Sequence, residues 1–256
     1  MDYLSLTVVI LTKNEETNII DVINNAKQLT GSVLVIDSGS TDKTVELAEK
    51  YGAKVVYRAW DNDFSAQRNF ALEHVSTEWV LYLDADERLN STLIEAIKKV
   101  LIKNENKQYV LKRKSVAFGQ EFNYGTLKPD FVPRLFKTKY VHWVNKVHEK
   151  PVCSDASETL NGHIEHYTYS SWSQWFTKFD HYTTIWAQDA FSKGKKGTLG
   201  KAFCHSFFGF LQMLILKKGI LDGGMGIVLC VMHFLYTLTK YLKLMELQRE
   251  NACTKG

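Results

Sequence analysis

The first hundred residues alternate between short apolar runs and amphipathic stretches. Four of the runs are continuous and rich in β-branched or aromatic residues, which is typical of strands buried on both faces of a parallel sheet. They predict strands at residues 6–11, 32–36, 54–57 and 79–83.

The stretches between these runs repeat apolar residues every three or four positions, as on one face of a helix. Helices that alternate with strands in this way predict βαβ units and a parallel sheet. The expected helices run over 15–29, from a cap at Ser40 or Thr41 to just before Gly52, over 64–74, and from a cap at Asn90 or Ser91 through Leu101.

The pattern changes in the second half of the chain. From about Gln108, short apolar and aromatic pieces mix with basic residues, so we expect short strands and loops that extend the sheet; from Ser171 onward the pattern is helical. Residues 1–110 hold 12 Lys and Arg against 17 Asp and Glu, whereas residues 111–256 hold 20 against 11. A basic half can face nucleic acid, an anionic membrane or a phosphorylated acceptor. No aromatic–basic module with a known nucleic-acid-binding spacing occurs, so nucleic acid is not expected as a partner.

Polar clusters follow three of the predicted strands directly. In parallel sheets, ligands bind outside the carboxyl ends of the strands, so these clusters are expected to meet on one rim. Taken alone, each cluster can also be explained without a ligand, as a solvated turn or a helix cap. The clusters are Thr12-Lys13-Asn14-Glu15, Asp37-Ser38-Gly39-Ser40 and Asp84-Ala85-Asp86.

The acids of these clusters suggest a metal and a nucleotide. Asp84 and Asp86 can converge on one divalent cation and the phosphates that it carries, and oxygen ligands suit Mg²⁺ or Mn²⁺. Asp37 can accept a hydrogen bond from a nucleobase N–H, or it can bond its own turn. The chain has no G-x-G-x-x-G or P-loop pattern, so a nucleotide would depend on a metal and acids rather than on a glycine-rich loop.

Together, several segments carry a resemblance to family 2 glycosyltransferases. This resemblance implies the α/β GT-A fold of nucleotide-diphospho-sugar transferases, which is a Rossmann-like mixed sheet flanked by helices. In this chain a helical, partly apolar C-terminal region is expected to follow that fold. Three later segments resemble one bacterial branch, the lipopolysaccharide core β-glucosyltransferases. The family segments are 9–16, 35–44, 67–69 and 83–87, and the branch segments are 147–149, 164–167 and 219–226.

The resemblance also implies a UDP-sugar donor and a role for each cluster. The implied contacts are Asp37 with uracil, Thr12, Asn14 and Glu15 with base and ribose, Asp84 with ribose or metal, and Asp86 with Mg²⁺ or Mn²⁺. Ala85 and Arg68 are further candidates for binding the nucleotide-sugar.

The family inverts the anomeric centre by direct displacement, so a base must take the proton of the acceptor hydroxyl. The best late acid is Glu149, with Asp130 as the second candidate; an exposed loop glutamate is the ordinary interpretation of Glu149. Arg68 and Arg134 can hold sugar hydroxyls or phosphates. The ordinary alternatives are an exposed helix residue for Arg68 and a strand-edge charge for Arg134, and a functional role is preferred for Arg68. His163 and His166, three residues apart, form a metal pair only with a third ligand, so a structural role is preferred for them.

We expect a GT-A catalytic domain at 1–167, with a nucleotide-sugar half at 1–107 and an acceptor half at 108–167, followed by a helical region at 168–256. The apolar runs of that region, 203–216 and 227–238, are shorter than the roughly 20 residues that a bilayer requires and have lysines at their ends. Interfacial helices are therefore expected; packing on the catalytic domain or on a second copy in a homo-oligomer is the alternative. No secretory signal precedes the first strand, so we expect a cytoplasmic protein attached peripherally to the inner membrane.

The sequence thus predicts an inverting, metal-dependent hexosyltransferase. It would move a hexose, with glucose as first candidate, from a UDP-sugar to a lipid-linked glycan acceptor, the inner-core heptose of lipopolysaccharide. A family 2 transferase for another surface polysaccharide or a protein-linked glycan is the alternative. A sugar-nucleotide pyrophosphorylase would have a glycine-rich loop after its first strand, and a non-enzymatic membrane adaptor would not explain three polar clusters.

Overall fold

The computed structural model describes residues 5–146 and 149–253. These divide into two compact units. Unit 1 contains the chain up to Arg113 and Asp130–Tyr167; unit 2 contains Lys114–Pro129 and the chain from Thr168 onward. The segment 114–129 therefore groups with the C-terminal helices.

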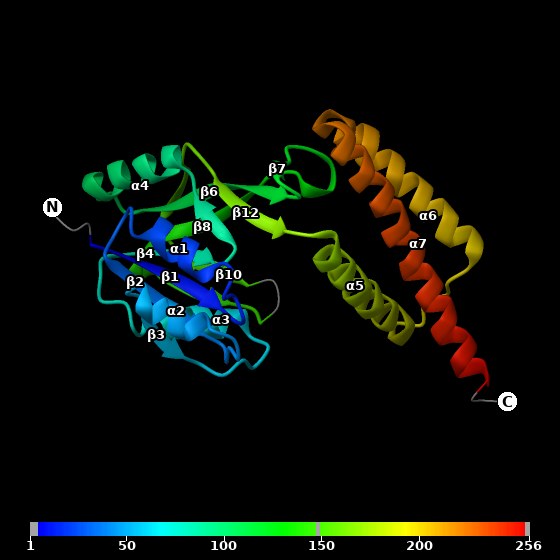
Figure 1. Cartoon of the computed structure of the whole chain (residues 1–256), viewed down its shortest axis with the longest axis horizontal. Coiled ribbons are helices and arrows are strands. Elements are labelled where there is room, and N and C mark those ends of the chain that lie inside the picture. Colours follow the sequence, from blue (N-terminus) through cyan, green and yellow to red (C-terminus); the bar gives the residue numbers. More distant parts are fainter. Residues whose placement is uncertain (1–4, 147–148, 254–256) are drawn as a thin grey trace. The chain divides into compact units, whose positions relative to one another are not determined.

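Unit 1 is built on a mixed sheet whose central strands are parallel (Figure 1). β1 (Leu6–Thr12) pairs in parallel with β2 (Ser32–Asp37) and with β4 (Trp79–Asp84), and β2 pairs with β3 (Lys54–Tyr57). The residues of β1, β2 and β4 are almost all buried, as expected for strands covered on both faces. The four predicted strands are confirmed, and three of them end one residue later than expected.

Further strands extend this sheet on the side of β4. Within the described residues the order of the sheet is β3-β2-β1-β4-β8-β6-β12-β5, with β7 and β11 also paired to β6 and a separate β9–β10 pair. These strands are β5 (Glu87–Leu89), β6 (Lys107–Ala117), β7 (Gln120–Glu121), β8 (Asp130–Lys137), β9 (Val141–Val144), β10 (Lys150–Cys153), β11 (Ala156–Thr159) and β12 (Ile164–Tyr169).

Helices cover both faces of the central strands. α1 (Ile19–Ala26), α2 (Thr44–Lys50) and α4 (Ser91–Lys103) share a buried apolar cluster with one face of the sheet. α3 (Phe64–Leu72) and β9 share a second cluster with the other face. Alternate residues of β1 belong to the two clusters, because successive side chains of a strand point to opposite faces.

Two helices begin later than their sequence pattern predicts. α1 begins at Ile19 rather than Glu15, because residues 15–18 form a turn. α2 begins at Thr44, because the hydroxyl of Ser40 bonds an acid of its own loop instead of capping the helix. Both delays leave polar residues in the loops at the carboxyl edge of the sheet.

Unit 2 is mainly helical. α5 (Trp172–Ser192) and α6 (Leu199–Leu211) both pack against α7 (Gly223–Cys253). α6 continues as a π-helical turn at Gln212–Leu216, and a 3₁₀ turn at Gly219–Asp222 leads into α7.

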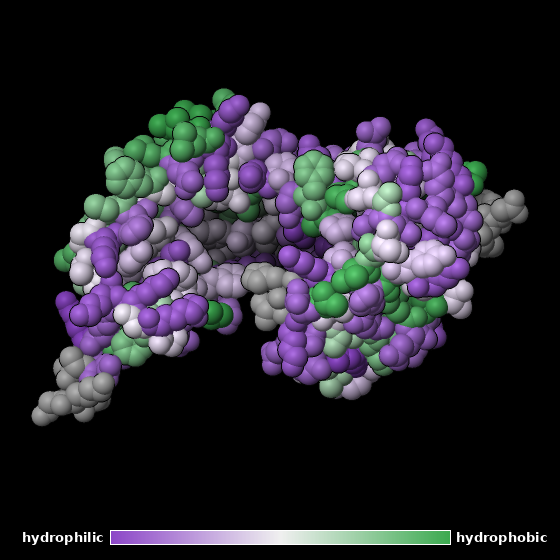
Figure 2. Space-filling model, turned by 180° about the vertical axis from the view of Figure 1, so that it is seen from behind, coloured by the Kyte–Doolittle hydropathy of each residue, from purple (hydrophilic) through white to green (hydrophobic). Residues whose placement is uncertain are grey.

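Two segments of unit 2 are long and apolar enough to cross a membrane by length and composition alone: Leu199–Leu216 and Gly219–Asn251. The second is longer than the apolar run expected at 227–238, because α7 continues as one helix past Lys240. Only 17% and 22% of the two segments' apolar windows are buried, and Figure 2 shows hydrophobic side chains on the surface of this unit. Large exposed apolar side chains include Leu199, Phe203, Phe207, Phe208, Ile215, Leu216, Ile220 and Leu221.

Candidate active site

The carboxyl ends of β1, β2 and β4 border a cavity of about 280 Å³ in unit 1. The three strands are parallel, so the loops that follow them meet at one edge of the sheet. The hydroxyl of Thr12 is buried there and has no hydrogen-bond partner among the described residues, which leaves it available to a ligand. The predicted site residues that line this cavity are Thr12, Glu15, Asp84, Ala85 and Asp86.

Asp37 and Asn14 are absent from the described lining of this cavity and hold its loops instead. The carboxylate of Asp37 accepts hydrogen bonds from the amides of Gly39 (2.8 Å) and Ser40 (3.0 Å). Asn14 has a φ of 55°, and its side-chain oxygen accepts from the amide of Thr41 at 2.8 Å, across to the other loop. Asp37 therefore has the geometry of an aspartate that bonds its own turn.

Asp86 lies beside a histidine whose expected role is structural. Nε2 of His166 is 3.3 Å from Oδ2 of Asp86. β12 pairs antiparallel with β5 and places His166 opposite Glu87, one residue from Asp86. The two paired strands are far apart in the sequence, so the sequence pattern does not predict that His166 lies beside Asp86.

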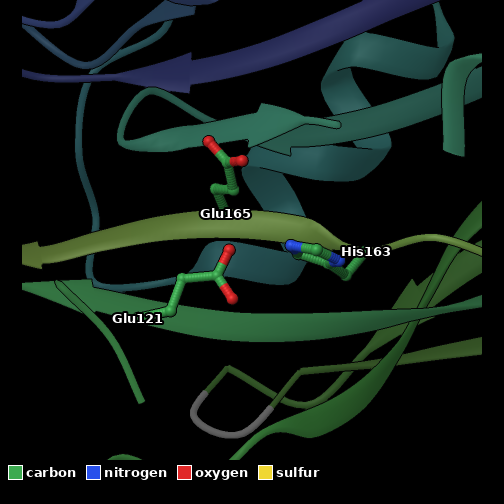
Figure 3. A group of neighbouring side chains, drawn as sticks. All are labelled: Glu121, His163 and Glu165. Carbon is green, nitrogen blue, oxygen red and sulfur yellow. The ribbon is translucent and has the colours of Figure 1, made fainter. Parts of the chain in front are cut away.

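His163 has a different partner from His166. Figure 3 shows His163 just before β12 and Glu165 on that strand. Nδ1 of His163 is 3.1 Å from the side-chain nitrogen of Asn90, the residue that caps α4 as predicted. Of the two histidines, His166 adjoins the acid predicted to hold the metal, and His163 adjoins the cap of α4.

The residues at Asp86 fit the divalent cation that the family implies. A carboxylate suits Mg²⁺ or Mn²⁺, and an adjacent imidazole adds a nitrogen donor suited to transition-metal ions. Asp86 and His166 are both partly exposed, at 28% and 24% of their side chains, so an ion can reach them.

Asp84 is held by two arginines. Nη2 of Arg134 is 2.7 Å from Oδ2 of Asp84, and Nη2 of Arg68 is 3.2 Å from Oδ1. Burial favours the neutral acid, but the positive charges of Arg134 and Arg68 outweigh it and hold the pKa of Asp84 well below its usual range. Asp84 is therefore ionised at neutral pH, with both oxygens already engaged.

A fully buried glutamate completes this network. Oε1 of Glu87 accepts hydrogen bonds from Arg134 (2.8 Å) and Arg113 (3.1 Å). Burial raises the pKa of Glu87, and the negative charge of Asp84 raises it further against the attraction of the arginines. Arg68 is only 4% exposed, so the interpretation of Arg68 as an exposed helix residue is wrong. Arg134 is equally buried, and its charge is paired with Asp84 and Glu87.

A second cavity, of about 180 Å³, adjoins Asp84 and contains Glu149 in its lining. Oε1 of Glu149 is 3.4 Å from Nη2 of Arg68, the same nitrogen that contacts Asp84. Asp84 lines both cavities, so Glu149 lies close to the acids after β4 although it follows them by some sixty residues. Val147 and His148, which precede Glu149 in its motif, lie outside the described residues.

Asp130 has a different environment. Its two oxygens accept from Nε (3.0 Å) and Nη2 (2.7 Å) of Arg113. Burial raises the pKa of Asp130, but the hydrogen bonds from Arg113 outweigh it and lower the pKa overall. Asp130 is absent from the described lining of both cavities.

Two aromatic residues that line the first cavity are not among the predicted site residues. Trp60 and Phe64 line it with ring centroids 4.6 Å apart, and Phe64 is 46% exposed. Their signal is present in the sequence, as aromatic residues within the polar stretch 58–64.

Comparisons with known proteins identify the family. The family model described as glycosyl transferase family 2 matches residues 7–156. An uncharacterized glycosyltransferase of Rickettsia conorii is 28% identical over 263 residues, which cover 96% of this chain and 91% of the relative. One of Rickettsia typhi is 27% identical over 252 residues, which cover 93% and 85%.

Solved structures show weaker likeness. S. aureus TarS 1–349 in complex with UDP has a TM-score of 0.48 at 16% identity, with 96% of this chain and 91% of that chain covered. Glucosyl-3-phosphoglycerate synthase from Mycobacterium tuberculosis, in complex with Mn²⁺, UDP and phosphoglyceric acid, has a TM-score of 0.39 at 21% identity, with 52% and 56% covered. At these TM-scores the likeness carries no conclusion about what this chain binds. The family match covers more than half of the chain, so the chain belongs to glycosyl transferase family 2 and is a glycosyltransferase of the GT-A fold class.

Proposed function

We propose that this glycosyltransferase moves a hexose, with glucose as first candidate, from a UDP-sugar to a lipid-linked glycan, and that the acceptor is the inner-core heptose of lipopolysaccharide. The main support is the cavity at the carboxyl edge of the sheet, which joins residues from the β1, β2 and β4 loops in a family 2 chain. In this proposal residues 1–167 form the catalytic domain, with a donor half at 1–107 and an acceptor half at 108–167.

The donor nucleotide would occupy the first cavity. Trp60 and Phe64 offer aromatic faces on which a base can stack, an interaction worth roughly 1–3 kcal/mol per base. Thr12 and Glu15 offer polar groups for base and ribose. Asp37 would contribute to the uracil site mainly by holding the conformation of the loop that follows β2.

Asp86 and His166 would hold Mg²⁺ or Mn²⁺, and Asp84 would add a fixed negative charge next to them. The cation, when bound, supplies a positive charge that stabilises the departing diphosphate. Arg68 and Arg134 keep Asp84 ionised and correctly directed.

Glu149 would act as the base. Its carboxylate accepts the proton of the acceptor hydroxyl while that oxygen forms a bond to the anomeric carbon and the bond from this carbon to UDP breaks. The proton ends on Glu149 and the negative charge leaves with UDP. Arg68 would direct Glu149, since one guanidinium nitrogen contacts both Glu149 and Asp84.

Unit 2 would attach the enzyme peripherally to the inner face of the cytoplasmic membrane, where a lipid-linked acceptor lies. Its apolar side chains are exposed along α6 and α7. Helices of this kind bind the interface through apolar area and through lysines that attract anionic lipids.

A transfer assay tests this proposal. The purified chain is incubated with labelled UDP-glucose, Mn²⁺ and a rough lipopolysaccharide that ends in inner-core heptose, and both UDP release and transfer of label are measured. We expect UDP release that depends on the acceptor. Transfer to a different glycan only would contradict inner-core heptose as the acceptor. Transfer from a different UDP-sugar only would contradict glucose as the transferred hexose, and an absence of UDP binding would contradict a UDP-sugar as the donor.

A further inference from the structure

Unit 2 contains a cavity of about 330 Å³ that has no role in the proposed transfer reaction. We call it the lysine pocket. None of the described residues that line it is acidic. They are Lys195, Lys196 and Lys201, together with Trp186, His205, Tyr241 and Leu244.

The three lysines of the pocket have no carboxylate partner in the described part of the chain. Nζ of Lys201 donates only to the carbonyl of Lys196, at 3.4 Å. The nearby Lys193, by contrast, pairs with Asp189 at 2.8 Å. Three like charges around one hollow repel one another, and Lys196 and Lys201 also lie at the N-terminal end of α6, where the helix dipole is positive. A bound anion would offset part of this positive charge.

The loop that carries the lysines is fixed to the helices around it. The amide of Lys195 donates to the carbonyl of Ala190 at 3.0 Å, and its carbonyl accepts from the side chain of Gln248 on α7 at 2.8 Å. Gly197 packs so closely on α7 that a Cβ there would lie 3.0 Å from Met245. The backbone that carries Lys195 and Lys196 is therefore held in place against α7.

Aromatic and apolar side chains line the pocket together with the lysines. The ring of His205 stacks on Tyr241 with centroids 5.3 Å apart, and Leu244 is fully buried. A lining that combines lysines with aromatic and apolar side chains suits a phosphate that carries an organic group better than it suits a bare ion. On α6, the helix of Lys201 and His205, Phe203 and Phe207 are both more than half exposed.

We propose that the lysine pocket binds the phosphate headgroup of an anionic membrane lipid while exposed apolar side chains of α6 enter the acyl boundary. This inference rests on the membrane attachment in the proposed function, and it adds a specific lipid site to that attachment. Each lysine near an anionic surface contributes roughly a fivefold factor to binding, so three contribute roughly a hundredfold at most, and their removal should weaken binding by at least about tenfold.

Vesicle co-sedimentation of the full chain tests the site. The vesicles are phosphatidylcholine with or without phosphatidic acid. The test variant carries Lys195→Gln, Lys196→Gln and Lys201→Gln; the matched control carries Lys98→Gln, Lys99→Gln and Lys103→Gln on α4, which removes the same charge from unit 1. We expect the test variant alone to lose at least about tenfold in affinity for phosphatidic acid vesicles.

Equal losses in the two variants would mean general electrostatic attraction, and no loss in the test variant would mean that the pocket is not used; either result overturns the proposal. UDP binding, measured on the same samples, shows whether each variant is folded and whether the donor site works, so failure of the lipid site and failure of the catalytic proposal are distinguishable. In a further experiment, inorganic phosphate is titrated into the wild type and the test variant without vesicles, at constant ionic strength. Phosphate binding that needs the three lysines, combined with no vesicle binding, would overturn the lipid as the source of the phosphate.

Discussion

Glu149 and Asp130 are both acids late in the catalytic domain, but arginines hold them differently. Asp130 forms a two-bond pair with Arg113, whereas Glu149 has one long contact with Arg68 and faces a cavity that Asp84 also lines. A base needs a carboxylate that can reach the acceptor hydroxyl, and of these two acids Glu149 is the one that lines a described cavity.

We therefore expect Glu149→Gln to lower the transfer rate by about 10²- to 10⁴-fold, because the amide cannot take a proton, while UDP affinity stays unchanged. Single-turnover transfer and UDP titration measure the two effects. Asp130→Asn is the matched control and should retain transfer. A large loss in Asp130→Asn with activity kept in Glu149→Gln would move the base to Asp130.

At the scale of elements, a buried charge network joins β4, β5 and β8. Arg134 on β8 contacts Asp84 at the end of β4 and the fully buried Glu87 on β5. Removing one partner of a buried pair leaves an uncompensated charge, so we expect Arg134→Met to lower the free energy of unfolding by about 3–5 kcal/mol at neutral pH. Arg58→Met, whose arginine pairs with the exposed Asp61, should cost less than about 1 kcal/mol. Urea unfolding measures both.

The loss in Arg134→Met should shrink in acid. The pKa of Glu87 is already raised, and loss of Arg134 raises it further. A group with a raised pKa in the folded state binds a proton where the unfolded chain has lost it, so it stabilises the folded state more as the pH falls. The difference in unfolding free energy between Arg134→Met and the wild type should therefore be smaller at about pH 5.5 than at about pH 7.5. A difference that grows in acid would contradict this account of Glu87.

The turn that leads into β12 depends on a glycine. Gly162 has a φ of 94°, and a Cβ there would lie 2.4 Å from the amide nitrogen of Leu93 at the start of α4. We expect Gly162→Ala to cost about 2–4 kcal/mol in unfolding free energy, from backbone strain plus overpacking. Gly119→Ala is the control, since Gly119 has a φ of 80° and a Cβ there would meet no atom within 4 Å, so this change should cost only about 1 kcal/mol. Equal losses of unfolding free energy in the two variants would show that close packing against Leu93 does not add to the effect of Gly162→Ala.

The elements differ in how well the sequence predicts them. β1 to β4 follow from continuous apolar runs, and their order brings Thr12, Glu15 and Asp86 to one cavity as expected. The pairing of β5 with β12 joins residues almost eighty positions apart, so no local pattern predicts that His166 lies beside Asp86. Arg68 lies under aromatic rings, with its Cζ 4.7 Å from the Trp143 ring, and tertiary contacts of this kind are also invisible to periodicity.

At the scale of the whole molecule, the two units carry different parts of the proposed function. The charge asymmetry of the sequence predicts a division of roles, but not that the segment 114–129 groups with the C-terminal helices. The apolar pattern also underestimates the continuous length of α7, because lysines interrupt the apolar run although long charged side chains are compatible with one helix.

Membrane attachment makes a prediction about exposed apolar residues. Phe208 on α6 is 68% exposed, and Ile102 on α4 is 75% exposed. If unit 2 enters the interface, Phe208→Glu should weaken binding to lipid vesicles by roughly tenfold, whereas Ile102→Glu should not. Flotation with vesicles of bacterial lipid measures both. Equal binding of the two variants would contradict attachment through α6.

The most direct test of the central claim is calorimetric titration of UDP into the wild type, Asp86→Ala, His166→Ala and His163→Ala, each with and without Mn²⁺. The account predicts that Mn²⁺ strengthens UDP binding in the wild type and in His163→Ala, and that Asp86→Ala and His166→Ala each lose at least about tenfold of that Mn²⁺-dependent affinity. UDP binding that is absent, or that is unchanged by Mn²⁺ and by Asp86→Ala, would contradict a metal-dependent donor site at the end of β4.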